Sequence, residues 1–99
     1  MPMLVDLSHA KRHLEITTDS EDTLIVAKVL EASDVITDYL AELADDTWTS
    51  DTVPARVRSA VLLMLSHLWE HRGDDMEPDE KVWQAIGRVL ARTRAPVIA

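Results

Sequence analysis

The sequence predicts an all-α fold: a small single-domain bundle of about four helices, with an acidic loop before the last helix. The chain of 99 residues is long enough for one modest core. Only two glycines and four prolines interrupt a sequence rich in Ala, Leu, Glu and Arg, a composition that favours helices. The apolar residues recur at steps of three and four, as they do on one face of a helix. We therefore expect residues 1–99 to form a single domain.

Two helices are expected in the first half of the chain. Asp6 is placed to cap a short helix over about Leu7–Leu14, because its carboxylate accepts unpaired amide hydrogens of the first turn and complements the helix dipole. Ser20 is the best candidate to begin a long second helix that runs to about Leu43. The second helix carries a broad apolar stripe made of Leu24, Ile25, Val29, Ala32, Val35, Ile36, Tyr39, Leu40 and Leu43.

A polar loop is expected to separate the second helix from a third. Residues 45–52, DDTWTSDT, have short polar side chains that compete for backbone hydrogen bonds. Trp48 in this loop is expected to cover the edge of the core, with a subunit anchor as the alternative. Pro54 suits the first turn of a helix that ends near His71. That helix is apolar almost all round, so either it is the central element or a second subunit covers part of it.

The last quarter of the sequence predicts a connector, a fourth helix and a tail. Gly73 is placed to stop the third helix, and the acidic run that follows indicates a solvated connector. The fourth helix is expected from about Asp79 to Thr93, ended by Pro96. We expect the 73–80 loop and the 93–99 tail to be flexible.

The net charge of -8 is concentrated in the first half of the chain. Residues 1–50 carry eleven acids and three bases, whereas residues 51–99 carry seven of each. A protein that binds DNA tightly through its phosphates normally has a basic stripe, so we expect no tight DNA binding. The asymmetry suits contact between unlike patches of neighbouring molecules, although an acidic surface that only aids solubility is the simpler explanation.

The chain has no cysteine, which excludes disulfides, thiolate zinc sites and a cysteine nucleophile and is compatible with a reducing cytoplasm. The N-terminal MPMLVDLSHAKR lacks the basic start and long apolar run of a signal peptide. No window approaches the roughly 18 apolar residues of a membrane span. We expect a soluble, unexported chain with no membrane contact.

Two histidine pairs are the sharpest sign of site chemistry. His9 and His13, like His67 and His71, are four residues apart, which places both imidazoles of a pair on one helix face, where they could chelate zinc or nickel. Neither pair has the HExxH arrangement of a metalloprotease, and exposed or hydrogen-bonded histidines are the default. The sequence also lacks a GxSxG turn and a glycine-rich phosphate loop. We therefore predict no enzyme activity, no cofactor and no metal site.

Three stretches of the sequence share residue types, order and spacing with one protein family. The start has an amphipathic turn followed by basic residues and a His-Leu pair, in Val5-Asp6-Leu7 and Lys11-Arg12-His13-Leu14. An acidic entry into the second helix spans 19–22 and precedes Leu24-Ile25, with Ala32 and Tyr39 further along. The third helix carries Val53-Pro54, Val57, Ala60, Leu62-Leu63, Trp69 and Arg72. Together these stretches resemble the small head-tail connector, or adaptor, proteins of tailed bacteriophages. Trp69 replaces the family's usual tyrosine, and the region between Gly73 and Val82 departs from the family pattern.

The resemblance implies a structural virion protein at the head-tail interface, assembled in the host cytoplasm. It implies a homo-oligomeric ring that lies beneath the portal protein. This ring continues the DNA channel, through which DNA only passes, and it supports the next connector, stopper or tail protein.

A ring needs a heterologous interface, in which one patch of each subunit meets a different patch of the next. We hypothesise that the acids Asp34, Asp38 and Glu42 face the bases Arg56, Arg58 and Arg88 of a neighbour, with Trp48 as an additional interface residue. The resemblance further implies that the C-terminus reaches the portal, through Arg92, Arg94, Val97 and Ile98.

The alternative is a small helical regulatory or antitoxin-like module that binds a partner protein through its apolar third helix. That alternative predicts a monomer or a dimer rather than a ring.

Overall fold

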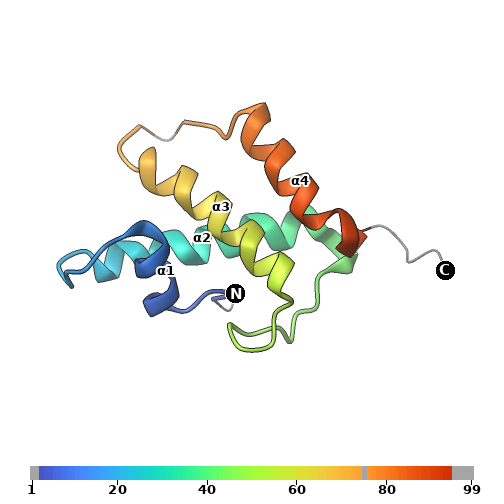
Figure 1. Cartoon of the computed structure of the whole chain (residues 1–99), viewed down its shortest axis with the longest axis horizontal. Helices are drawn as coiled ribbons and strands as arrows, with labels where there is room; N and C mark the ends of the chain where they lie inside the picture. Colours follow the sequence, from blue (N-terminus) through green and yellow to red (C-terminus); the bar gives the residue numbers. More distant parts are fainter. Residues whose placement is uncertain (1–2, 75, 95–99) are drawn as a thin grey trace.

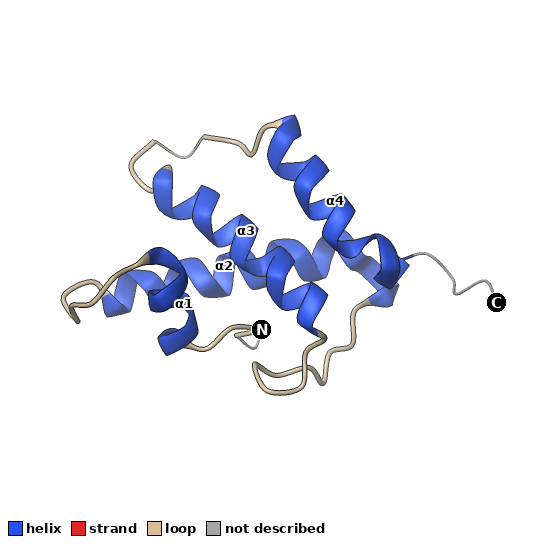
Figure 2. Cartoon of the chain, viewed as in Figure 1, coloured by secondary structure: helices blue, strands red, loops and turns tan. Residues whose placement is uncertain are grey.

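The computed structural model describes residues 3–74 and 76–94, with the side chains of 92–94 left out. It contains the helices α1 (Leu7–Leu14), α2 (Asp22–Leu40), α3 (Ala55–Glu70) and α4 (Glu80–Arg94), with a 3-10 turn, η1 (Ala41–Leu43), after α2 (Figure 1). The described residues contain helices and loops but no strand (Figure 2). The predicted all-α class is therefore confirmed. Within these residues, no helix is both long enough and apolar enough to cross a membrane.

The core forms where α3 meets the other helices. α3 packs against α1, α2 and α4, and α2 crosses behind it in Figure 1. The inward face of α3 is fully buried and has helical spacing, with Val57, Ala60, Val61, Met64 and Leu65. The other helices supply Ala10, Ile25, Val29, Ala32, Ile36, Leu40, Ile86 and Leu90. α3 is therefore the central element, which is one of the two arrangements that its sequence left open.

The other sides of α3 are covered within one copy of the chain. Leu62, Leu63, Leu68 and Trp69 are half-buried and pack against the core. Among the described residues, the exposed large apolar side chains are Leu24, Leu43 and Met76, none of which lies on α3. A second subunit is not needed to shelter this helix, so an argument for assembly has to come from other surfaces.

The cap of α1 follows the prediction. The Asp6 carboxylate accepts a hydrogen bond of 2.7 Å from the His9 backbone amide. At the other end, Glu15 adopts the left-handed conformation, with φ 60° and ψ 38°, and its amide donates to the carbonyls of Lys11 and Arg12. Both ends of this short helix are thus closed by local hydrogen bonds, which matters because eight residues are too few for a stable isolated helix.

The start of α2 lacks the predicted serine cap, and charged side chains link it to α1. α2 begins at Asp22, and the Ser20 hydroxyl instead lies 3.4 Å from that of Thr18. Lys11 Nζ of α1 lies 2.7 Å from Asp19 Oδ1 and 2.8 Å from Asp22 Oδ1. The second contact is an ion pair by distance alone, since Asp22 Oδ1 makes no aligned hydrogen bond. The hydrogen bond to Asp19 is the main reason that the pKa of Lys11 is raised, and it lowers the pKa of Asp19.

The end of α2 comes earlier than predicted. The helix stops at Leu40 because Ala41 has a φ of 52°, a conformation that residues with a Cβ rarely adopt. Leu43 therefore lies in η1 and is exposed. Leu24, which was also expected in the buried stripe, is 38% exposed, because it lies about 100° around the helix from the buried Ile25.

The third and fourth helices begin and end close to the predicted positions. Pro54 is the N-cap residue of α3, which ends at Glu70, before the turn that contains Gly73. The Asp79 carboxylate accepts a hydrogen bond of 3.1 Å from the Val82 amide and so caps α4. α3 and α4 run in opposite directions, joined by the connector 71–79 at one end of the molecule (Figure 1).

Gly87→Ala is expected to raise the free energy of unfolding by about 0.5–1 kcal/mol, because alanine loses less backbone entropy in a helix. The new methyl group fits, since the nearest atom to the Cβ position is the Tyr39 hydroxyl oxygen at 3.9 Å. Urea denaturation measures the change. The opposite substitution at an exposed position of α2, Ala27→Gly, should lower stability by a similar amount, and a destabilised Gly87→Ala chain would contradict this account of α4.

Candidate functional site

The predicted acidic patch lies exposed along α2 and η1. Asp34 and Asp38 are one helical turn apart on α2, and Glu42 follows in η1. These three residues are called the acidic ridge below. Within the described part of the chain none of them has an ion-pair partner. Like charges at this spacing repel each other, so the ridge is a surface on which a cation from outside the chain is favoured.

The predicted basic partners of the acidic ridge differ in whether they already bind within their own chain. Arg56, near the start of α3, and Arg88, on α4, are exposed and form no ion pair within the described residues. Arg58 is half-buried, and its guanidinium donates a hydrogen bond of 3.1 Å to the Ser50 carbonyl. Arg58 is therefore partly engaged in holding its own loop, whereas the guanidinium groups of Arg56 and Arg88 have no ion-pair partner among the residues that the structure describes.

The structure describes Trp48 but not the side chains of the predicted portal contacts. Trp48 is half-buried and packs against the core, as expected for a side chain that covers the core edge. The predicted portal contacts Val97 and Ile98 lie outside the described residues, as do the side chains of Arg92 and Arg94. Their role stays a prediction.

The four histidines do not gather at one site. His13 Nε2 lies 2.7 Å from Ser66 Oγ and so links α1 to α3, while His9 is half-buried in α1. His67 and His71 lie close together, with ring centroids 4.6 Å apart. Across the described ranges 3–74 and 76–94, no group of three or more His, Asp or Glu side chains is arranged to hold a metal ion.

His67 and His71 instead anchor the connector between α3 and α4. His67 is 8% exposed, and its Nε2 lies 2.9 Å from the Met76 carbonyl oxygen, to which it donates as the N–H tautomer. The Met76 amide in turn donates to Asp74 Oδ1 at 2.9 Å, and His71 Nδ1 lies 3.2 Å from the same oxygen. This cluster of four residues, the connector anchor, holds the loop against the end of α3.

Asp74→Ala is expected to destabilise the chain at neutral pH but not in strong acid. The Met76 amide, followed by His71, lowers the pKa of Asp74 below its usual 3.8. A lowered folded-state pKa means that the carboxylate stabilises the fold above pH 3.8 and loses this effect as the pH falls through the folded-state pKa.

Urea denaturation of the wild-type chain and of Asp74→Ala, at pH 6 and at pH 2, measures the difference in stability. Hydrogen exchange of the Met76 amide is the local readout. Glu70→Ala, at an exposed position near the end of α3, is the matched control and should leave the Met76 amide unchanged. An equal loss at both pH values would show that the carboxylate charge is not responsible.

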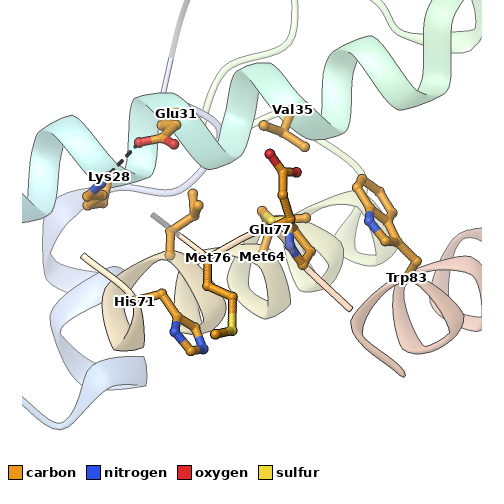
Figure 3. Close-up of a pocket in the computed structure, with 10 residues that line it drawn as sticks. Lys28, Glu31, Val35, Met64, His71, Met76, Glu77 and Trp83 are labelled. Atoms are coloured by element: carbon orange, nitrogen blue, oxygen red, sulfur yellow. Dashed lines mark hydrogen bonds and ion pairs between the residues drawn. The ribbon is translucent and has the colours of Figure 1, made fainter. Parts of the chain in front are cut away.

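A pocket of about 360 Å³ opens beside the connector anchor, between α2, α3 and the start of α4 (Figure 3). Apolar side chains from all three helices, including Val35, Leu68 and Trp83, form much of its lining. Lys28 and Glu31 stand together on α2, with 3.2 Å between Nζ and Oε1, and Glu77 enters from the connector with its carboxylate turned toward α2 in this view. The full lining is Lys28, Glu31, Val35, Met64, Leu68, His71, Met76, Glu77, Pro78 and Trp83.

The pocket and the connector anchor did not follow from the sequence. The pocket-facing residues of α2, Lys28, Glu31 and Val35, have helical spacing, and this spacing was a usable signal. The position of Met76 and Glu77 over that face depends on how the connector folds back. No local pattern specifies this path, because it depends on the hydrogen bond between the buried His67 of α3 and the Met76 carbonyl, nine residues further along the chain.

One of three comparisons with known proteins gave a match. Residues 4–84 match the model of the phage gp6-like head-tail connector protein family. Searches of curated proteins and of solved structures gave no match. The matched range runs from the residues before α1 into α4 and includes the whole of α2, α3 and the connector. Because the match covers well over half of the chain, this protein belongs to the phage gp6-like head-tail connector family.

Proposed function

We propose that this protein assembles into a ring of identical subunits that docks beneath the portal, continues the DNA channel and supports the next connector, stopper or tail protein. Its family is one of structural virion proteins that join the phage head to the tail. The expected location is the head-tail interface of the virion, after assembly in the host cytoplasm. In this role the protein is a structural component with no catalytic step.

The observation that carries the ring proposal is the pairing potential of exposed acids and exposed arginines on one copy. The acidic ridge and the free guanidinium groups of Arg56 and Arg88 all lack an ion-pair partner within the described part of one copy. Exposed groups of opposite charge on different helices can meet across a heterologous contact, which closes into a ring when the rotation between subunits permits. Trp48 adds a half-buried aromatic side chain to the candidate interface.

Charge reversal tests this interface. A chain with Asp34→Lys and Asp38→Lys is expected to lose ring formation, because each contact would then bring together like charges. Adding Arg56→Glu and Arg88→Glu to the same chain should restore assembly. Wild-type assembly should also weaken as salt rises, since exposed charges are screened over about 8 Å at physiological ionic strength. Sedimentation velocity at several salt concentrations measures both effects.

Asp51→Lys is the matched control, because Asp51 is an exposed acid outside the ridge. It should assemble like the wild type. Assembly that ignores both salt and the reversed ridge would remove these residues from the interface.

We propose that the C-terminal segment, with Arg92, Arg94, Val97 and Ile98, provides the contact with the portal. A chain that ends at Ala91 should form rings but fail to bind the portal protein, which a pull-down with purified portal measures. Retained portal binding would place the contact elsewhere.

The regulatory or antitoxin-like alternative is less well supported. It relied on an exposed apolar face of α3, and the large apolar side chains of this helix are buried or half-buried in the described chain.

A further inference from the structure

We infer that the pocket between α2, α3 and α4 receives the C-terminal segment, residues 95–99, of a neighbouring copy when no portal is present. This inference deepens the proposed function and rests on it, because the occupant belongs to an identical subunit of the same assembly. The contact is heterologous, since a pocket on one copy meets the tail of another.

The pocket is suited to an apolar segment that arrives with a positive charge. Val35, Leu68 and Trp83 offer apolar surface from three helices, and Met76, which is 57% exposed, stands at the edge. A methionine side chain adapts readily to the shape of an incoming group. Lys28 is already paired with Glu31 at 3.2 Å, so Glu77 is the pocket charge that lacks an ion pair within the described residues. The pocket therefore favours a cation beside apolar side chains.

The C-terminal residues combine apolar side chains with positive charge. Residues 92–99, RTRAPVIA, place Arg92 and Arg94 directly before Val97 and Ile98, and no acidic side chain occurs in the segment. Burying a Val or Ile side chain contributes roughly 1.5–3 kcal/mol, so this short tail has apolar residues that gain from cover.

The reach of the tail disfavours contact with Trp83 of its own copy, which supports a neighbouring copy as the donor. The pocket lies at the start of α4, beside Trp83, whereas the tail leaves from Arg94 at the other end of the helix (Figure 1). Eleven residues of helix separate these two positions, which corresponds to about 16 Å. Ile98 is four residues beyond Arg94 and extends at most about 14 Å from it, even fully stretched. The Ile98 Cα therefore stops short of the Trp83 Cα of its own copy, and contact with the remaining lining residues of the same copy is the alternative that the cross-linking test below distinguishes.

The same C-terminal segment is the proposed portal contact, so the neighbour's pocket and the portal compete for it. The neighbour's pocket would shelter the apolar tail in free rings, and portal binding would withdraw it. Portal protein should therefore reduce occupancy of the pocket by the tail.

Disulfide trapping tests this directly, because the natural chain has no cysteine. The full-length chain with Val35→Cys and Ile98→Cys is assembled at low salt, oxidised and run on a non-reducing gel. We expect a ladder of covalent multimers that contains most of the protein, and a several-fold weaker ladder when portal protein is added first. Met76→Cys with Ile98→Cys is a second pair that does not disturb the core, since Met76 is exposed. The matched control is Ser59→Cys with Ile98→Cys, because Ser59 is exposed on α3 and does not line the pocket.

The outcomes separate this inference from the proposed function. Monomers with an internal disulfide, and no covalent multimers, would show that the tail reaches the pocket of its own copy. A ladder from the Ser59 control as strong as that from the pocket cysteines would show unspecific collision. Either result overturns the inference. Rings that bind portal but give no ladder with either pocket cysteine overturn it while the proposed function stands. Failure of the wild-type chain to form rings or bind portal would overturn the proposed function itself.

Discussion

Replacing Leu65 by alanine is expected to lower the free energy of unfolding by about 2–5 kcal/mol. Leu65 is fully buried in α3, the helix that packs against each of the other three. Truncation removes apolar contacts and leaves a cavity at the centre of the core. Since a small domain has a total stability of about 5–15 kcal/mol, the loss is a large share, and a urea denaturation curve measures it.

Leu24→Ala is the matched control for this substitution. The same atoms are deleted, but Leu24 is 38% exposed on α2, so the expected loss is below about 1 kcal/mol. Equal losses at the two positions would contradict the assignment of α3 as the central helix.

Ser33→Ala should cost about 1–3 kcal/mol, because it leaves a buried amide without an acceptor. Ser33 is fully buried on α2, and its Oγ accepts a hydrogen bond of 3.1 Å from the Leu4 amide. This bond fixes the N-terminal residues against the core, where Leu4 and Val5 are themselves buried. The substitution should lower the urea midpoint and also speed hydrogen exchange at the Leu4 amide.

Thr37→Val is the control for Ser33→Ala. Thr37 Oγ1 donates to the Ser33 carbonyl at 2.7 Å, an oxygen that lies within the regular hydrogen bonding of α2 and keeps a backbone partner. Losing the hydroxyl should therefore change stability little. If Thr37→Val is as harmful as Ser33→Ala, the buried Leu4 amide is not the source of the effect.

The sequence predicted the helices well because their signals are local. Asp6 and Pro54 stand at the starts of α1 and α3, and the helical spacing of apolar residues identified the buried faces of α2 and α3. The end of α2 was placed too late, because Ala41 interrupts the helix with a positive φ. No property of an alanine indicates such a conformation.

The candidate site was only partly accessible to sequence reasoning. The exposure of Asp34 and Asp38 follows from their place opposite the apolar stripe of α2. By contrast, the hydrogen bond of Arg58 to Ser50 and the anchoring of Met76 by His67 depend on how two loops fold back onto α3. The sequence left open whether α3 is the central element or is partly covered by another copy, and the packing of Leu62 and Leu63 against the core supports the first arrangement. Tertiary contacts of this kind have no local sequence signature.

Electron microscopy of the purified chain mixed with the portal protein of its phage tests the central proposal most directly. At low salt, our account predicts closed rings of the chain on one end of the portal, coaxial with its channel. Bare portals beside free monomers, at every salt and protein concentration tried, would contradict it.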